Sequence, residues 1–136
     1  MEDKKPAVDV NRRRVGFTGY CGFVFTQVLP DRVVISCTLR PELLNPGGIA
    51  HGGLIATLTD VAAGCMALQA DGGEHEIVTQ NCNIHYLRPG TGPVLRAEAR
   101  VIRKGHRVCV VQVDCLNEDE SCAATAIYEI AYLSPI

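Results

Sequence analysis

The sequence predicts a single α+β domain that combines one long buried helix with an antiparallel sheet of about six strands. Three observations carry this prediction. The chain has 136 residues, which is the size of one ordinary domain. Only one stretch, residues 53–70, is long and apolar enough for a core helix. Two β-prone runs precede that stretch and four follow it, and the short connections between them are typical of an antiparallel sheet.

The N-terminal part is expected to be an arm followed by a β-hairpin. Residues 1–15 are polar and irregular, so they are predicted to form a flexible arm, and the domain is predicted to span residues 16–136. Residues 20–29 are β-prone. A turn that begins with proline separates them from a second strand over residues 33–39, in which every other residue is apolar.

The helix predicted over residues 53–70 follows a loop rich in proline and glycine over residues 41–48. It is apolar nearly all round, which is typical of a helix inside a core rather than on a surface. Counting along the helix from Asp60 in steps of three and four gives a stripe of small residues on the same side, which tight contact with a strand or room for a ligand would explain. These residues are Gly53, Ala56, Ala63, Gly64 and Ala67.

Four strands are predicted after the helix, over residues 77–87, 94–103, 107–116 and 121–133. In the second strand apolar and charged residues alternate, so one of its faces is predicted to be wet. In the first strand the alternation places apolar residues on one side and four polar residues on the other. The apolar residues are Val78, Ile84 and Tyr86, and the polar ones are Thr79, Asn81, Asn83 and His85. A polar face of this kind is expected to line a cleft, a subunit contact or solvent. Separately, a sheet that is covered by only one helix keeps an exposed edge, which favours self-association.

The charge of the chain argues against broad nucleic-acid binding. The formal net charge is −2, whereas proteins that bind nucleic acid usually carry a basic excess. One local exception, Arg12-Arg13-Arg14, is interpreted as a solvated run, because three charges make a weak patch.

The cysteines and the N-terminus bear on the compartment of the protein. Seven cysteines are scattered along the chain without any CxxC pair, so neither a zinc site nor a disulfide framework is predicted. Free thiols in apolar runs are typical of a reducing compartment. The N-terminus lacks the apolar core of a signal peptide, and no apolar run is expected to be long enough to span a membrane. A cytoplasmic location without membrane insertion is therefore expected.

A single charged residue, Asp60, lies in the middle of the apolar helix. A carboxylate is costly to bury there, so it needs a partner, a cavity or a function. At the start of the helix, His51-Gly52-Gly53 contains no Ser, Thr or Asp, so the first helical N–H groups are predicted to lack a side-chain acceptor. Free N–H groups at a helix N-terminus can bind a carbonyl oxygen or an anion, and glycine lets a ligand approach the backbone.

The order of these residues resembles that of the hotdog-fold thioesterases: Asn45, then His51-Gly52-Gly53, then Asp60, then a strand that reads NIHYLRP from Asn83. The similarity is greatest to acyl-CoA thioesterases of the phenylacetate-pathway and thioesterase-superfamily-member-2 type, and it covers about residues 16–133. It implies a curved antiparallel sheet wrapped around the long helix. It also implies homodimers, often paired into homotetramers, with active sites across the dimer interface. No cofactor and no metal are implied.

The resemblance implies the hydrolysis of acyl-CoA thioesters to free acid and coenzyme A. Asn45 and the backbone N–H of Gly52 would polarise the thioester carbonyl. Asp60 from the other subunit would be the general base that aligns water, or alternatively a nucleophile. His51 would orient the thioester or assist the thiolate leaving group. Thr79 stands where these enzymes often carry a Ser or Thr that helps to hold the water, if the loop before it is shifted by one residue.

Further residues are candidates for contacts with the substrate. Gly53 and Asn83 belong to the matched motifs. A group of basic residues at predicted strand ends could meet the phosphates of coenzyme A, although such charges often serve only solubility. This group consists of Arg88, Arg103, Lys104 and Arg107.

Two other functions stay open at this point. Hotdog domains also serve as hydratases or dehydratases, and as acyl-CoA-binding modules without catalysis. Dehydratases of this fold carry prolines after the loop histidine, whereas glycines follow His51 directly. The glycines therefore disfavour dehydratase chemistry. A pure binder would gain little from a carboxylate beside a carbonyl site, so Asp60 favours a thioesterase over a binding module.

Overall fold

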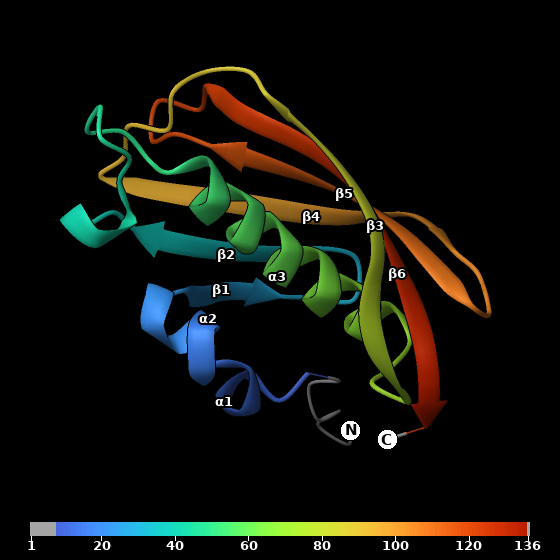
Figure 1. The fold of residues 1–136 in the computed structure, drawn as a ribbon. Helices are drawn as coiled ribbons and strands as arrows, with labels where there is room; N and C mark the ends of the chain where they lie inside the picture. The colour runs from blue at the N-terminus through green and yellow to red at the C-terminus, as the bar shows by residue number, and fades with distance from the viewer. Residues whose placement is uncertain (1–7, 136) are drawn as a thin grey trace.

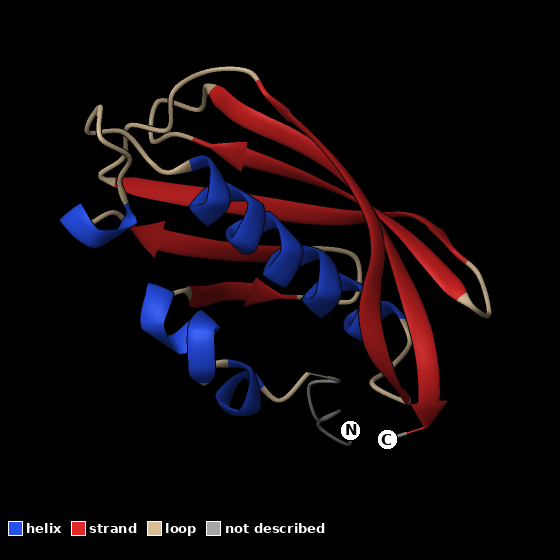
Figure 2. Ribbon diagram, viewed as in Figure 1, coloured by secondary structure: helices blue, strands red, loops and turns tan. Residues whose placement is uncertain are grey.

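The computed structural model describes residues 8–135, in which a curved six-stranded sheet wraps around the long helix α3 (Figure 1). Figure 2 shows how α3 lies in the hollow of the sheet, with two short helices beside it. Neighbouring strands all pair antiparallel, in the order β1-β2-β4-β5-β6-β3. The predicted fold, two strands followed by one helix and four strands, is confirmed. The elements are α1 (Val10–Arg13), α2 (Gly16–Cys21), β1 (Val24–Val28), β2 (Val33–Thr38), the 3-10 helix η1 (Pro41–Leu43), α3 (Gly52–Ala70), β3 (His75–Tyr86), β4 (Val94–Lys104), β5 (Val108–Leu116) and β6 (Cys122–Pro135).

The N-terminal segment differs from the prediction because it forms two short helices before β1. The prediction of a strand from residue 20 is wrong, since Tyr20 and Cys21 belong to α2. Gly22 ends that helix in the left-handed conformation, with a φ of +72°. Within the predicted arm, Asp9 caps α1 by accepting hydrogen bonds from two backbone N–H groups. The remainder of that arm, residues 1–7, lies outside the described residues.

Helix α3 supplies the centre of the core. Leu58, Ala62 and Met66 are fully buried against the inner face of the sheet, which confirms the predicted burial of the helix. The small residues that share one side of α3 with Asp60 fall into two groups. The C-terminal members pack tightly, and a Cβ atom on Gly64 would lie 3.0 Å from the side chain of Ile77. The N-terminal members, Gly53 and Ala56, remain exposed or partly exposed.

By length and composition alone, α3 could cross a membrane. The expectation that no apolar run reaches that length is therefore wrong. However, 61% of the apolar window of Gly52–Ala70 is buried within the fold, as in the core helix of a globular domain.

Tyr128 links β6 to the middle of α3 and provides a test of how the core is held. Its hydroxyl lies 2.7 Å from Oγ1 of Thr59 and donates to the carbonyl oxygen of Ala56 at 3.1 Å, and both Tyr128 and Thr59 are buried. We expect Tyr128→Phe to lower the free energy of unfolding by about 1–3 kcal/mol, because it leaves buried polar groups without a partner. Urea denaturation would measure this change. The matched variant is Tyr20→Phe, whose 60% exposed ring should tolerate the substitution; equal effects of the two variants would contradict the interpretation.

Strand β3 lies at an edge of the sheet and contains a β-bulge that changes which residues share a face. Thr79 pairs with Ile130 and Asn81 with Glu129, so Gln80 is an extra residue between two successive pairs. The prediction that Thr79 shares a face with Asn81 is therefore wrong, because an extra residue reverses the alternation. Thr79 points toward α3, where it bonds to a side chain of that helix. The other polar residues of the predicted face lie on the outer side: Asn81, Asn83 and His85.

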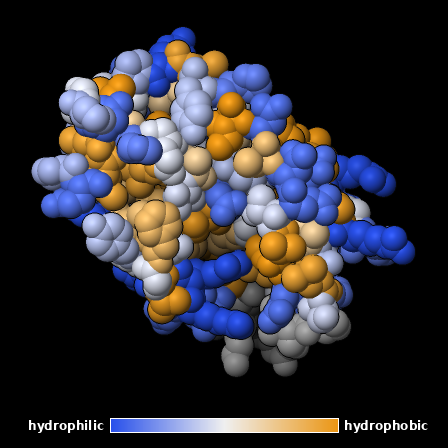
Figure 3. All heavy atoms as spheres, viewed as in Figure 1, coloured by the Kyte–Doolittle hydropathy of each residue, from blue (hydrophilic) through white to orange (hydrophobic). Residues whose placement is uncertain are grey.

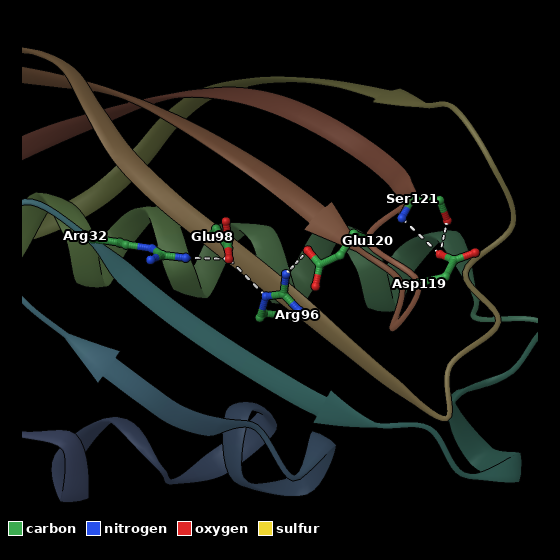
Figure 4. Close-up of polar contacts among 6 residues, drawn as sticks. All are labelled: Arg32, Arg96, Glu98, Asp119, Glu120 and Ser121. Atoms are coloured by element: carbon green, nitrogen blue, oxygen red, sulfur yellow. Dashed lines mark hydrogen bonds and ion pairs between the residues drawn. The ribbon is translucent and has the colours of Figure 1, made fainter.

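The outer face of β4 carries a chain of ion pairs (Figure 4). Arg32 bonds to Glu98, which also accepts from Arg96, and Arg96 reaches Glu120. Burial alone would raise the pKa of Glu98, but the hydrogen bonds from Arg96 and Arg32 hold it below its ordinary value. The opposite face of the strand is apolar and buried, which confirms the predicted wet and dry faces of β4.

All seven cysteines are free. Most are buried, and burial raises the pKa of the Cys65 thiol to about 11, so that it is un-ionised at neutral pH. Cys122 is partly buried, and Cys82 is exposed on the edge strand β3 although it lies in an apolar run of the sequence.

Candidate active site

Asp60 lies on the side of α3 that faces the open edge of the sheet. Its side chain is partly buried, and its Oδ1 atom accepts a hydrogen bond of 2.6 Å from the hydroxyl of Thr79. The bulge at Gln80 is what turns Thr79 toward the helix. Within residues 8–135, the second carboxylate oxygen of Asp60 has no hydrogen-bond partner. The carboxylate is thus held in one orientation while one oxygen stays available.

A cavity of about 270 Å³ opens beside this carboxylate. Asp60 and Thr79 are among its polar lining residues, and Val61 and Ile77 contribute apolar surface. Figure 3 shows the molecule hollowed on this side, in the region between the short N-terminal helices and the strands β3 and β6. Hydrophilic side chains border the hollow on the side of the N-terminal helices (Figure 3).

The start of α3 is capped by a residue that the sequence-based prediction did not count as a cap. His51 occupies the N-cap position, and its Nδ1 accepts a hydrogen bond of 2.8 Å from the N–H of Gly53. The expectation of an uncapped turn is therefore wrong for Gly53. The N–H of Gly52, by contrast, has no acceptor in the described part of the chain. Because Nδ1 of His51 is an acceptor here, the neutral ring carries its proton on Nε2 and can donate from it.

Tyr86 supports this turn from β3. Its hydroxyl donates to the carbonyl oxygen of Gly52 at 2.9 Å, and its ring lies against the same residue. A Cβ atom on Gly52 would lie 3.6 Å from the ring, in ordinary contact. Tyr86 belongs to the strand motif that carries the family resemblance, but nothing in the sequence indicated that its hydroxyl reaches the helix start.

Asn45 is fixed in the loop before α3 with its amide nitrogen free. Its Oδ1 accepts hydrogen bonds from the N–H groups of Gly47 and Ile49, at 2.9 and 3.3 Å. These bonds identify the oxygen end of the amide, so Nδ2 points away from the turn. Nδ2 has no acceptor among the described residues and can donate to a carbonyl oxygen.

The other predicted substrate contacts are not brought together with Asp60 in one chain. Asn83 lies on the outer face of the β3–β6 pair, in a shallow hollow with Asn81 and His85. Arg88 donates to the carbonyl oxygen of Cys122, at the end of β3 that approaches the start of α3. The remaining basic residues surround the turn between β4 and β5, at the opposite end of the sheet (Figure 1); they are Arg103, Lys104 and Arg107.

One group of side chains among the described residues has the composition of a metal site. Asp71, Glu74 and His75 place ligand atoms within 4.8 Å of one another after the end of α3. The carboxylate of Asp71 already bonds to the backbone and the ring of His75, and Lys104 approaches it at 3.7 Å. These bonds explain why Asp71 and His75 lie together at the end of α3, and they do not require a metal ion.

Comparisons with known proteins point in the same direction as the geometry. The family model described as the thioesterase superfamily matches residues 47–124. The medium/long-chain acyl-CoA thioesterase YigI of Escherichia coli is 32% identical over 97 residues, which cover 60% of this chain and 63% of that protein. The acyl-coenzyme A thioesterase PaaI of the same organism is 29% identical over 92 residues, with coverage of 67% and 64%. The chain thus spans less than two thirds of the length of these relatives.

A solved structure shows the same fold. The thioesterase HI1161 of Haemophilus influenzae superposes with a TM-score of 0.86, at 17% identity, over 92% of this chain and 88% of that one. At this level of identity the likeness concerns the fold alone, which is the hotdog fold.

Proposed function

The chain belongs to the thioesterase superfamily, the enzymes of which hydrolyse thioesters, and we propose that its substrates are acyl-CoA thioesters, which it cleaves to free acid and coenzyme A. The observation that carries this proposal is the arrangement at Asp60. One oxygen of the carboxylate is held by Thr79, and the other is free beside a cavity. A positioned carboxylate of this kind can take a proton from water.

The carbonyl site and the base are too far apart to act on one thioester within a single chain. Asp60 follows Gly52 by eight positions on a regular helix, which places the two residues about 12 Å apart along its axis. A water molecule that attacks a carbonyl carbon must lie within contact distance of it, and its base within hydrogen-bond reach. We therefore infer that each active site combines the helix start of one protomer with Asp60 of a second protomer.

The proposed reaction follows from these groups. The N–H of Gly52 and Nδ2 of Asn45 donate to the thioester oxygen and stabilise the negative charge that develops on it. Asp60 of the second protomer accepts a proton from water as the water oxygen bonds to the carbonyl carbon. The hydroxyl of Thr79 donates to Asp60, and its oxygen can accept a hydrogen bond from the same water. When the tetrahedral intermediate collapses, the C–S bond breaks and the thiolate takes up the proton, while Nε2–H of His51 donates to the departing sulfur.

Release of free thiol tests the proposal. Purified protein would be supplied with acyl-CoAs of short, medium and long chain and with an aryl acyl-CoA, and the thiol would be trapped with a chromogenic disulfide. We expect turnover of at least one of these substrates, with a rate proportional to the amount of enzyme. Binding of several acyl-CoAs without release of thiol would contradict hydrolysis and would favour a binding module.

An active site formed by two protomers requires a surface on which they pair, and we expect this surface to be the edge strand β3. This strand exposes backbone and apolar side chains, among them Val78, which is 48% exposed. If protomers pair along this edge, the chain should sediment as a dimer or a dimer of dimers. We expect Val78→Lys to shift the protein toward monomer, because a charged edge resists pairing. It should also lower the thioesterase activity, both through dissociation and because Val78 lines the cavity beside Asp60.

A matched variant separates this effect from general surface change. Ile102→Lys places the same charge at a position that is 52% exposed on β4, a strand in the middle of the sheet. It should leave both the sedimentation coefficient and the activity unchanged. Full activity in a monomeric Val78→Lys protein would contradict the shared site.

A further inference from the structure

Arg13 differs from its neighbours in the basic run at the end of α1. Arg12 and Arg14 are exposed, whereas Arg13 is partly buried and lines the same cavity as Asp60 and Thr79. The interpretation of this run as solvated is therefore wrong for Arg13. The cause lies in the packing of the N-terminal segment: α2 contacts α3, and Arg13, at the end of α1, lines the cavity together with Asp60 and Gly64 of α3.

The guanidinium group of Arg13 has no ion pair or hydrogen bond with any described residue. Burial lowers the pKa of Arg13 below its ordinary value, and the nearby carboxylate of Asp60 partly offsets this effect. The group nevertheless remains a cation at neutral pH. A partly buried cation without a partner is unfavourable, so its position beside the cavity needs an explanation.

We propose that Arg13 binds a carboxylate at the far end of the acyl group, so that the enzyme prefers acyl-CoA thioesters of short dicarboxylic acids to those of plain fatty acids. This inference rests on the proposed function. A guanidinium is planar and has a fork of N–H donors that matches a carboxylate in a bidentate fashion. With the thioester near Asp60, the acyl chain lies in the cavity and its distal end approaches Arg13.

The size and lining of the cavity agree with a short acyl group of this kind. A volume of about 270 Å³ lies just below the usual range for small-molecule sites, which begins at roughly 300 Å³. Val61 and Ile77 present apolar surface for the methylene groups between the two ends of the acyl group. Thr18, from α2, adds a hydroxyl to the wall of the same cavity and can donate to a carboxylate.

Two substrates of similar size and different charge test this preference. Glutaryl-CoA carries the distal carboxylate, and hexanoyl-CoA replaces it with an alkyl end. We expect the wild type to show the higher kcat/KM with glutaryl-CoA. Arg13→Gln should lower kcat/KM for glutaryl-CoA by roughly ten- to a hundredfold, the effect of one charge-assisted hydrogen-bonded pair, and should leave hexanoyl-CoA unchanged. Arg13→Lys, which keeps the charge but not the fork, should restore part of the loss.

The matched control is Arg14→Gln, which removes an equal charge from an exposed neighbour and should leave both substrates unaffected. A thermal unfolding midpoint for each variant shows whether the segment stays folded. Equal losses for the two substrates in Arg13→Gln, or a wild-type preference for hexanoyl-CoA, would overturn the inference while leaving thioesterase activity intact.

Binding measurements keep the two proposals apart. If the wild type hydrolyses neither these two substrates nor any acyl-CoA of the chain-length and aryl panel, the proposed function fails. Calorimetric titration of wild type and Arg13→Gln with both acyl-CoAs then decides the role of Arg13. Selective loss of affinity for glutaryl-CoA supports it, and equal affinities in the two proteins contradict it.

Discussion

Replacement of Asp60 by asparagine is expected to lower kcat for acyl-CoA hydrolysis by roughly a hundred- to ten-thousandfold, the range typical for removal of a general base. The change is nearly isosteric. The amide oxygen can still accept the hydrogen bond from Thr79, so the shape of the site should survive while its ability to take up a proton is lost. Single-turnover measurement of thiol release would show the loss in the chemical step itself.

Two observations would accompany this result if Asp60 is the base. The KM for the acyl-CoA should change little, because in the proposed shared site the carbonyl is bound by the helix start of the other protomer. The unfolding midpoint should not fall, because Asp60 makes no ion pair within the described residues. Undiminished turnover in Asp60→Asn would remove the base from the proposed mechanism.

Asn45→Asp is expected to lower kcat by roughly a hundred- to a thousandfold, the usual effect of losing one donor to a developing oxyanion. The side-chain oxygen of Asn45 holds the turn, and its nitrogen has no acceptor within residues 8–135. Aspartate keeps the oxygen that accepts from Gly47 and Ile49, so the loop should keep its conformation, but it offers no N–H and adds negative charge where charge develops. The comparison of kcat with the wild type under saturating substrate would measure the effect.

Asn45→Ala serves as the complementary variant. It removes both the donor and the turn bonds, so it should lower the activity and also the unfolding midpoint. If Asn45→Asp keeps wild-type kcat, the oxyanion is stabilised by backbone N–H groups alone, and Asn45 is only a turn residue.

The broad architecture could be predicted because it depends on patterns that repeat over many residues. The apolar composition of residues 53–70 is visible without any tertiary information, and alternation in β4 assigns its two faces correctly. The N-terminal helices could not be predicted in this way. The sequence of α2 contains two aromatic residues and three with a preference for turns or strands, and its helix is stabilised by tertiary bonds from Arg40.

Features of the site that depend on a single residue could not be predicted from the sequence. Gln80 resembles any polar strand residue, yet as the extra residue of a bulge it determines that Thr79 meets Asp60. His51 is not among the usual capping residues, but its ring nitrogen accepts as a cap would. Arg13 looks like its two exposed neighbours, and only the fold shows that it lines the cavity.

If protomers pair along the open edge of β3, as proposed, the catalytic rate depends on the concentration of the protein. When each site draws its base and its carbonyl donors from different protomers, a dissociated chain is inactive, so the specific activity should decline on dilution below the dissociation constant of the dimer. Ligand binding should in turn affect the association of the protomers. A substrate analogue that occupies the shared site must tighten association by the same factor by which association tightens its own binding. Dilution series with and without such an analogue would therefore report on assembly and catalysis together.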